Sequence, residues 1–293
     1  MAAEIDLPAA ERFLLTDARL IDRLRFAHRF RGGDAGAVRR ALAAYRNDDG
    51  GYAGVLEPDL RTPSSQPQSA ELALRLLDEL GPIDAADARP LCDWLTTVSD
   101  DEGGVPFTLA SAREHPAAPH WHHGDADHGS LNPTAALASL LHRHGIEHPW
   151  RERATAFCWQ RLADPAVPLE MYDVRAALWL LDPAVPPGPE AARERLVAGL
   201  HEHTALDPAA LAPGQPHRLG PLQMAPLPTS PGRALLPPDA VAAQLDALAG
   251  EQREDGGWDV PFPTVSAGAR AEWRGWATVE ALTILDAAGR LDR

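Results

Sequence analysis

Three Gly-Gly pairs that follow an acidic residue, each placed between helix-like segments, constrain the fold of this chain more than any other feature. The pairs begin at Gly50, Gly103 and Gly256, and the intervals between them are 53 and 153 residues, close to one and three units of 51. Each pair follows an acidic residue, and a period of this size fits a repeating unit of two helices and a loop. The 293 residues hold roughly six such units, which can close into a ring.

The spacing of apolar residues predicts an all-α protein, because helical periodicity recurs along the chain and no segment alternates as a strand would. We expect helices over residues 8–29, 35–46, 66–80, 84–98 or 87–98, 132–145, 148–162, 169–181, 190–203, 237–250 and 272–288. Residues 204–236 are rich in Pro and Gly and are predicted to form a long ordered loop or lid. We expect one domain over residues 1–293.

The charge and composition of the chain exclude several classes of partner. The net charge of −15 repels nucleic acid and anionic membranes. No apolar run approaches the roughly 20 residues of a membrane span, and the acidic N-terminus lacks the apolar centre of a secretory signal. Cys92 and Cys158 lack the spacing of a metal or redox motif. We expect a cytoplasmic protein with a small-molecule substrate, and the sequence leaves homo-oligomer formation open.

Two segments resemble known helical repeats. They are NDDGGYAGVLEPD at residues 47–59 and EQREDGGWDVPF at residues 251–262. Both resemble the repeats of squalene-hopene cyclases and of protein prenyltransferase β-subunits, and the part from Gln252 to Trp258 looks like the glutamine-tryptophan motif of triterpene cyclases. The resemblance implies an (α/α)6 barrel with a central cavity. It also implies a terpene cyclase-like or prenyltransferase-like enzyme that binds an apolar or isoprenoid-like small molecule.

The acidic motif of class II terpene cyclases does not stand in its usual register here. Those enzymes carry D-x-D-D shortly before Thr-Ala, but the four residues before Thr134 are Ser-Leu-Asn-Pro. The similar segment from Asp125 to His128 lies five residues earlier. The resemblance therefore implies acid-base carboxylates at the cavity mouth without assigning one of them. The candidates are Asp59, Asp125, Asp127 and Asp173.

The second half of the first repeat turn, residues 57–66, does not recur and is therefore the first place to look for function. Glu57, Asp59 and Arg61 alternate, so in an extended loop their side chains share a face. They can bind a polar substrate and tune a general acid, or form a structural ion-pair network between repeats. The expected substrate contacts are Glu57, Arg61, Gln66, Trp121, His122, Asn132, Tyr172, Trp273 and Trp276.

A histidine-rich segment, residues 120–128, raises the question of a metal. His120, His122, His123 and His128 lie there with Asp125 and Asp127, and such a density of ligands can bind a divalent ion. The spacing matches no specific zinc motif, and the segment can instead shuttle protons or line the cavity mouth. We therefore assign no metal ligands from the sequence.

Two other functions fit the same sequence. The chain can be a binding or scaffold protein that keeps the barrel without the acid motif. It can also be a carbohydrate-type hydrolase or lyase, which requires two carboxylates facing each other across a polar cleft. For that function Glu57 or Asp59 opposite Asp173 is the expected pair. A deep apolar cavity lined with aromatic residues favours the isoprenoid function instead.

Overall fold

The computed structural model describes residues 4–53, 55–122, 125–211 and 217–291. Within these ranges the chain forms thirteen α-helices and no strand, which confirms the predicted all-α class. The α-helices are α1 (Leu7–Asp17), α2 (Leu20–Arg31), α3 (Ala35–Ala43), α4 (Pro67–Glu79), α5 (Ala85–Val98), α6 (Pro119–His122), α7 (Leu131–Arg143), α8 (Pro149–Ala163), α9 (Met171–Ala177), α10 (Glu190–His203), α11 (Pro221–Met224), α12 (Pro238–Gly250) and α13 (Ala267–Ala287). Short 3-10 helices are η1 (Ala110–Glu114), η2 (Leu178–Leu181), η3 (Pro208–Leu211) and η4 (Arg233–Leu235).

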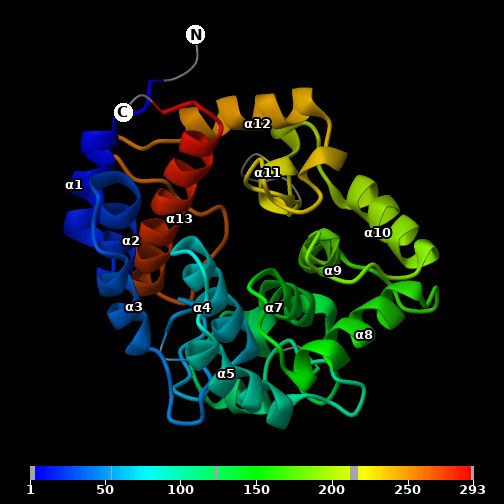
Figure 1. Ribbon diagram of the computed structural model, residues 1–293. Helices are drawn as coiled ribbons and strands as arrows, with labels where there is room; N and C mark the ends of the chain where they lie inside the picture. Colours follow the sequence, from blue (N-terminus) through cyan, green and yellow to red (C-terminus); the bar gives the residue numbers. More distant parts are fainter. Residues whose placement is uncertain (1–3, 54, 123–124, 212–216, 292–293) are drawn as a thin grey trace.

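Helices follow one another around the molecule in chain order (Figure 1). In this view α1, α3, α5, α8, α10 and α12 lie along the outline, whereas α4, α7, α9, α11 and α13 lie nearer the middle. Helix α4 packs against α7 and α7 against α9, while α13 contacts both α1 and α2. The last helix of the chain therefore lies beside the first two.

The three Gly-Gly turns, at residues 47–51, 100–104 and 253–257, have the same backbone geometry. In each turn the N–H of the first residue donates to the carbonyl oxygen of the fifth, at 2.9 to 3.0 Å. The first glycine of each pair has a φ between +92° and +100°, a conformation that favours glycine. The recurrence seen in the sequence is therefore a recurrence of local structure.

Each Gly-Gly turn packs against the next helix along the outline. A Cβ atom at Gly50 would lie 2.3 Å from the carbonyl oxygen of Pro90 in α5. A Cβ atom at Gly256 would lie 2.3 Å from the carbonyl oxygen of Ala9 in α1. The second glycine of each turn lies against an aromatic ring of the same helix, and these rings are Trp94, Phe157 and Phe13. The third turn thus joins the last helical pair to the first helix.

Gln252 strengthens this closing contact. Its Oε1 atom accepts the N–H of Asp6 at 2.9 Å, and its Nε2 atom donates to the carbonyl oxygens of Asp6 and Gly256, each at 2.9 Å. Trp258 is 2% exposed and donates its indole N–H to Leu248 in α12 at 2.8 Å. The glutamine-tryptophan segment is therefore an architectural element that links α12 to α1.

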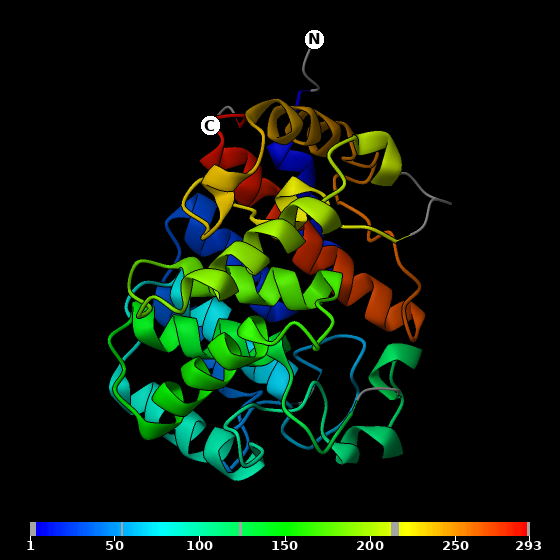
Figure 2. The ribbon, with the colours of Figure 1, turned by 90° about the vertical axis from the view of Figure 1, so that its right-hand side faces the viewer.

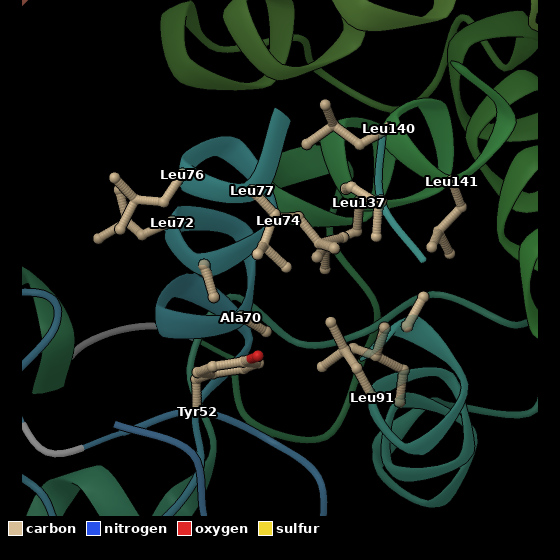
Figure 3. Packing of buried hydrophobic residues seen from close by; sticks show 14 of the residues in the cluster. Tyr52, Ala70, Leu72, Leu74, Leu76, Leu77, Leu91, Leu137, Leu140 and Leu141 are labelled. Atoms are coloured by element: carbon tan, nitrogen blue, oxygen red, sulfur yellow. The ribbon is translucent and has the colours of Figure 1, made fainter. Parts of the chain in front are cut away.

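The largest apolar core lies between α4, α5 and α7 (Figure 3). Leu74 and Leu77 of α4 meet Leu137 and Leu140 of α7, and Leu91 of α5 contributes from below. All five side chains are buried, and fully burying a leucine stabilises a fold by roughly 1.5–3 kcal/mol. This core holds α4 and α7 side by side.

Helices α4 and α7 run in parallel. Near the starts of α4 and α7, Gln68 donates to Asn132 at 3.3 Å. Near their ends, Asp78 of α4 pairs with Arg143 of α7 at 2.9 Å. In Figure 2 the start of α13 and the η1–α6 segment lie on the same side of the molecule, at the right.

Three sequence predictions about helices are wrong. Residues 8–29 form two helices, α1 and α2, because Ala18 and Arg19 are extended, with ψ angles of 158° and 155°. No Gly or Pro marks this break, which is stabilised where Arg19 donates to the carbonyl oxygens of Val55 and Leu56, each at 3.0 Å.

Helix α13 begins at Ala267, before the predicted residue 272, so Trp273 and Trp276 do not stand at its start. The predicted loop 204–236 contains α11, η3 and η4.

Candidate functional site

The loop that follows the first Gly-Gly turn crosses to α13 through Asp59 and Arg61. Asp59 is 2% exposed and accepts the indole N–H of Trp273 and the backbone N–H of Val265, both at 2.8 Å. Arg61 pairs with Glu272 of α13 through contacts of 3.2 and 3.0 Å. Both carboxylate oxygens of Asp59 are thus bonded to the α13 segment. These contacts are of the kind expected for a structural network between repeats.

Glu57 lies in the same loop but has a different environment. Its side chain is 5% exposed, and its Oε1 atom accepts the N–H of Asp59 at 3.2 Å. Burial raises the pKa of Glu57 to about 8, and the nearby Asp59 and Glu71 act in the same direction. The hydrogen bond from Asp59 and the charge of Arg19 oppose this rise. Glu57 therefore holds its proton at neutral pH and can donate it.

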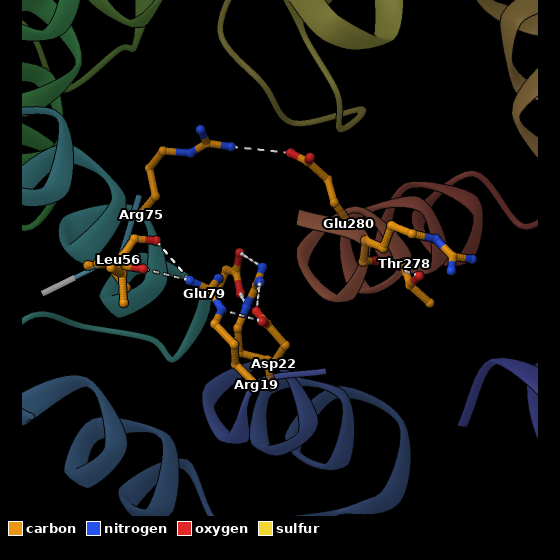
Figure 4. A network of polar contacts seen from close by, with 10 residues as sticks. Arg19, Asp22, Leu56, Arg75, Glu79, Thr278 and Glu280 are labelled. Carbon is orange, nitrogen blue, oxygen red and sulfur yellow. Dashed lines mark hydrogen bonds and ion pairs between the residues drawn. The ribbon is translucent and has the colours of Figure 1, made fainter. Parts of the chain in front are cut away.

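A network of ion pairs joins α2, α4 and α13 (Figure 4). We call this network the charged wall. Arg25 of α2 bonds Glu79 of α4 at 2.8 and 3.0 Å and Asp22 at 3.3 Å. Arg75 of α4 reaches across to Glu280 of α13 at 3.3 Å. Asp22 is completely buried and Arg25 is 3% exposed, and buried charges are found where they are paired and hydrogen-bonded. This wall is charged and its groups are held in place by one another.

The three tryptophans predicted for the cavity all have close partners. Trp276 is 4% exposed, and the guanidinium of Arg25 lies 4.1 Å from its ring centroid. Trp121 is 6% exposed and stacks on Phe107 with the ring centroids 4.9 Å apart. Trp273 is half-buried and donates its N–H to Asp59. Each of the three tryptophans is thus held by contacts with neighbouring side chains.

Gln66 and Asn132 make polar contacts at the starts of α4 and α7. Gln66 is completely buried; its Oε1 atom accepts the N–H of Leu109, and its Nε2 atom donates to Ser111 Oγ, both at 3.0 Å. Asn132 is half-buried and accepts from Gln68 at 3.3 Å. Gln66 thus anchors the η1 segment beside the loop of Glu57.

The remaining predicted contacts lie nearer the surface. Tyr172 is 41% exposed, and its hydroxyl is 2.7 Å from Nε2 of His217. His122 is half-buried at the end of α6. His123 of the histidine-rich segment lies outside the described residues. Across the described ranges, no three His, Cys, Asp or Glu side chains come together in a way that could hold a metal ion.

Asp125 and Asp173 line one hollow between the starts of α7 and α9 and the end of α8. This Asp173 hollow has a volume of about 260 Å³. It is lined by Phe107, Asp125, His128, Gly129, Ser130, Leu131, Arg161, Val167, Pro168, Glu170 and Asp173. Neither Glu57 nor Asp59 lines it, so this hollow does not bring Asp173 together with either of the partners that the sequence suggested. Asp125 is the carboxylate that shares the hollow with Asp173.

The two carboxylates have opposite environments. Burial raises the pKa of Asp173, and the charge of Glu170 adds to this effect, although the N–H of Glu170 donates to Asp173 at 3.3 Å. Asp125 accepts the N–H of Asp127 at 2.9 Å and lies 2.8 Å from Nδ1 of His128, and these bonds hold its pKa below the usual range. The same contact raises the pKa of His128. Pairs whose pKa values are pushed apart suit an acid and a base.

Sequence reasoning missed Arg161 and Glu170 of this hollow. Glu170 stands three residues before Asp173, a spacing that could have been recognised as a helix-start pattern. Arg161 lies in the last turn of α8 and has no local signal, because only the packing of α8 against α7 brings it to the hollow. Asp127, the other predicted acid, is exposed and donates its backbone N–H to Asp125 without lining the hollow.

Comparisons with known proteins do not assign a family. A scan against protein-family models finds no match, and a search of curated proteins finds no match either. None of the helices in the described ranges combines the length and apolar character needed to cross a membrane. The geometry of the site therefore carries the functional argument.

Proposed function

We propose that this chain is an acid-base enzyme for a polar small molecule, a hydrolase or lyase of the carbohydrate type, with its active site in the Asp173 hollow. Asp173 acts as the general acid and Asp125 as the general base, with His128 holding Asp125 ionised. Arg161 orients a polar group of the substrate. The observation that carries this proposal is that two carboxylates in opposite environments line one hollow.

We propose further that the helices form an (α/α)6 barrel. Six helices along the outline alternate in the chain with six others, α2, α4, α7, α9, α11 and α13. Three Gly-Gly turns of equal geometry pack against the next outer helix, and the third turn meets α1. In such a barrel the starts of the inner helices would surround one mouth. The Asp173 hollow lies at the starts of α7 and α9, and the Glu57 loop comes before the start of α4, as this arrangement requires.

The lining of the Asp173 hollow supports a polar substrate. Asp125, His128, Arg161, Glu170 and Asp173 all line it, and with Ser130 these polar side chains outnumber the apolar ones. A substrate with hydroxyl groups can exchange its hydrogen bonds with water for bonds to such a surface, whereas an isoprenoid chain cannot.

A terpene cyclase-like or prenyltransferase-like reaction is the second candidate. The lining of the Asp173 hollow includes four apolar side chains, those of Phe107, Leu131, Val167 and Pro168. A substrate with an apolar body and a polar end could lie with its body along Phe107 and its polar end toward Arg161. Acid catalysis by Asp173 would serve this reaction as well as the first.

Two substrate panels distinguish these functions. Aryl glycosides and oligosaccharides form one panel, and prenyl diphosphates and squalene-type substrates form the other, with products detected by mass spectrometry. Turnover in the first panel supports the main proposal, and turnover in the second supports the alternative. Absence of both turnover and binding at millimolar substrate in both panels would overturn the enzyme proposal, and binding without turnover would indicate a binding protein.

Variants then test the assigned roles. Asp173→Asn and Asp125→Asn should each lower kcat by about 10²- to 10⁴-fold, the range that general acid-base catalysis contributes. Asp17→Asn, at an exposed position of α1, is the matched control and should leave kcat unchanged. Full activity of both active-site variants would show that the chemistry takes place elsewhere.

A further inference from the structure

A second hollow lies at the start of α13 and shares no lining residue with the Asp173 hollow. Its volume is about 270 Å³, and two alanines of α13 form part of its wall. The remaining lining side chains are all charged, and they are Arg253, Arg270, Arg274, Asp255 and Asp259. Three guanidinium groups thus face two carboxylates, so the lining residues carry one excess positive charge in a chain whose net charge is −15.

Arg253 and Arg270 converge on one oxygen atom. Nη2 of Arg270 lies 2.7 Å from Oδ2 of Asp259, and Nη2 of Arg253 lies 3.9 Å from the same oxygen. The side chain of Arg270 is 43% exposed, and that of Arg253 is 60% exposed. A guanidinium has five N–H donors, so a single carboxylate oxygen leaves most of the donors of this pair to face the hollow and solvent.

Arg274 forms a fixed part of the wall. Its Nη2 atom contacts both oxygens of Asp255, at 2.9 and 2.8 Å, and its guanidinium lies 4.5 Å from the ring centroid of Phe13. Asp255 also accepts the N–H of Gly257 at 3.0 Å, so this pair is tied to the third Gly-Gly turn. The Nε atom of Arg274 is buried and has no hydrogen-bond partner within the described residues.

The start of α13 adds a favourable field. Ala267, the first residue of this 21-residue helix, lines the hollow. The N-terminus of a helix carries positive partial charge and free N–H groups, and both attract anions. Acidic residues are absent from the first turn of α13, so no side chain of that turn cancels this charge.

We propose that this hollow binds the phosphate group of a small molecule. Arg253 and Arg270 hold two phosphate oxygens by charge-assisted hydrogen bonds, Arg274 forms the rigid wall, and Asp259 competes with the anion for both movable arginines. Phosphate suits the hollow because several guanidinium groups can each take a different oxygen. The site is independent of the proposed chemistry in the Asp173 hollow.

Titration with inorganic phosphate, followed by ³¹P NMR and calorimetry at low ionic strength, tests this assignment. The double variant Arg253→Ala/Arg270→Ala should weaken phosphate binding by about tenfold or more, the loss of one or two charge-assisted bonds. Arg193→Ala, an exposed arginine of α10, is the matched control and should bind as the parent does. Failure of the parent protein to bind phosphate at 10 mM (roughly −2.7 kcal/mol) would overturn the proposal, as would unchanged affinity of the double variant.

The variant Asp259→Asn is expected to bind phosphate more tightly, a result that unfolding of the protein cannot produce. Asparagine keeps an oxygen that can accept the N–H of Val260, as Asp259 does at 2.9 Å, but it releases both arginines from a charged partner. Phosphate should therefore bind about three- to tenfold more tightly to this variant, because the competing charge is gone. Weaker or equal binding would mean that the three arginines form only a surface ion-pair network.

Discussion

Replacing Glu57 by glutamine should stabilise the protein at neutral pH. Glu57 is 5% exposed, and burial raises its pKa in the folded protein to about 8. In the unfolded chain the pKa of a glutamate is about 4.3. The folded state therefore binds this proton more tightly than the unfolded chain does. The contribution of the bound proton to the free energy of unfolding is complete below about pH 4 and is lost as the pH rises to about 8.

The size of the effect follows from the two pKa values. At pH values between these two pKa values, the folded state holds the Glu57 proton and the unfolded chain does not. The free energy of unfolding of the parent then falls by about 1.4 kcal/mol per pH unit. Glutamine resembles the protonated acid in shape and does not titrate. From pH 5 to pH 7, the stability of Glu57→Gln relative to the parent should therefore rise by roughly 2 to 3 kcal/mol.

Urea unfolding at pH 5, 6 and 7 measures this difference. The other titrating groups are common to both proteins, so subtracting the two free energies isolates Glu57. Glu194→Gln, at an exposed position of α10, is the control and should follow the parent at every pH. A difference between Glu57→Gln and the parent that does not change with pH would refute the assignment of a protonated, buried Glu57.

Gly50→Ala should lower the melting temperature more than Gly81→Ala, because both glycines have positive φ angles, +93° and +105°, but only at Gly50 would the new methyl lie 2.3 Å from a backbone oxygen. Equal losses would mean that φ strain alone matters. Trp273→Phe removes the N–H that bonds Asp59 at 2.8 Å and should cost about 1–3 kcal/mol in urea unfolding; parent-like stability would show that this bond is dispensable. Gln252→Ala should speed amide hydrogen exchange in α1 but not in α4, since its bonds join only the last turn to α1; unchanged exchange in α1 would contradict that role.

Local signals predicted several helices well. Helix α10 has the predicted bounds, Glu190–His203, and α8 begins at Pro149 with the side chain of His148 accepting the N–H of Trp150, as Pro and cap residues lead one to expect. The break between α1 and α2 had no such signal. It depends on Arg19 bonding to backbone oxygens more than thirty residues away, which no local pattern encodes.

The candidate site was predicted in parts but not as a whole. Asp125 and Asp173 were both named as acid-base candidates from their positions in the chain. That they line one hollow with Arg161 depends on how α7, α8 and α9 pack, and helix packing is not written in any single segment. The charged wall of Arg25, Glu79 and their neighbours was missed for the same reason, because each residue by itself reads as an ordinary helix-surface charge.

The sequence by itself determined the helical class and the three Gly-Gly turns. A close backbone approach at a positive φ requires glycine, and that requirement is visible in the residues themselves. Only the tertiary structure decided between Glu57 and Asp59, two acids one residue apart in the same loop. Asp59 meets Trp273 and Val265 and has both oxygens bonded, whereas Glu57 is buried with a single N–H donor and keeps its proton. The partners of Asp59 lie more than two hundred residues away in the chain, and the burial of Glu57 comes from the folded interior, so neither environment is written in the loop itself.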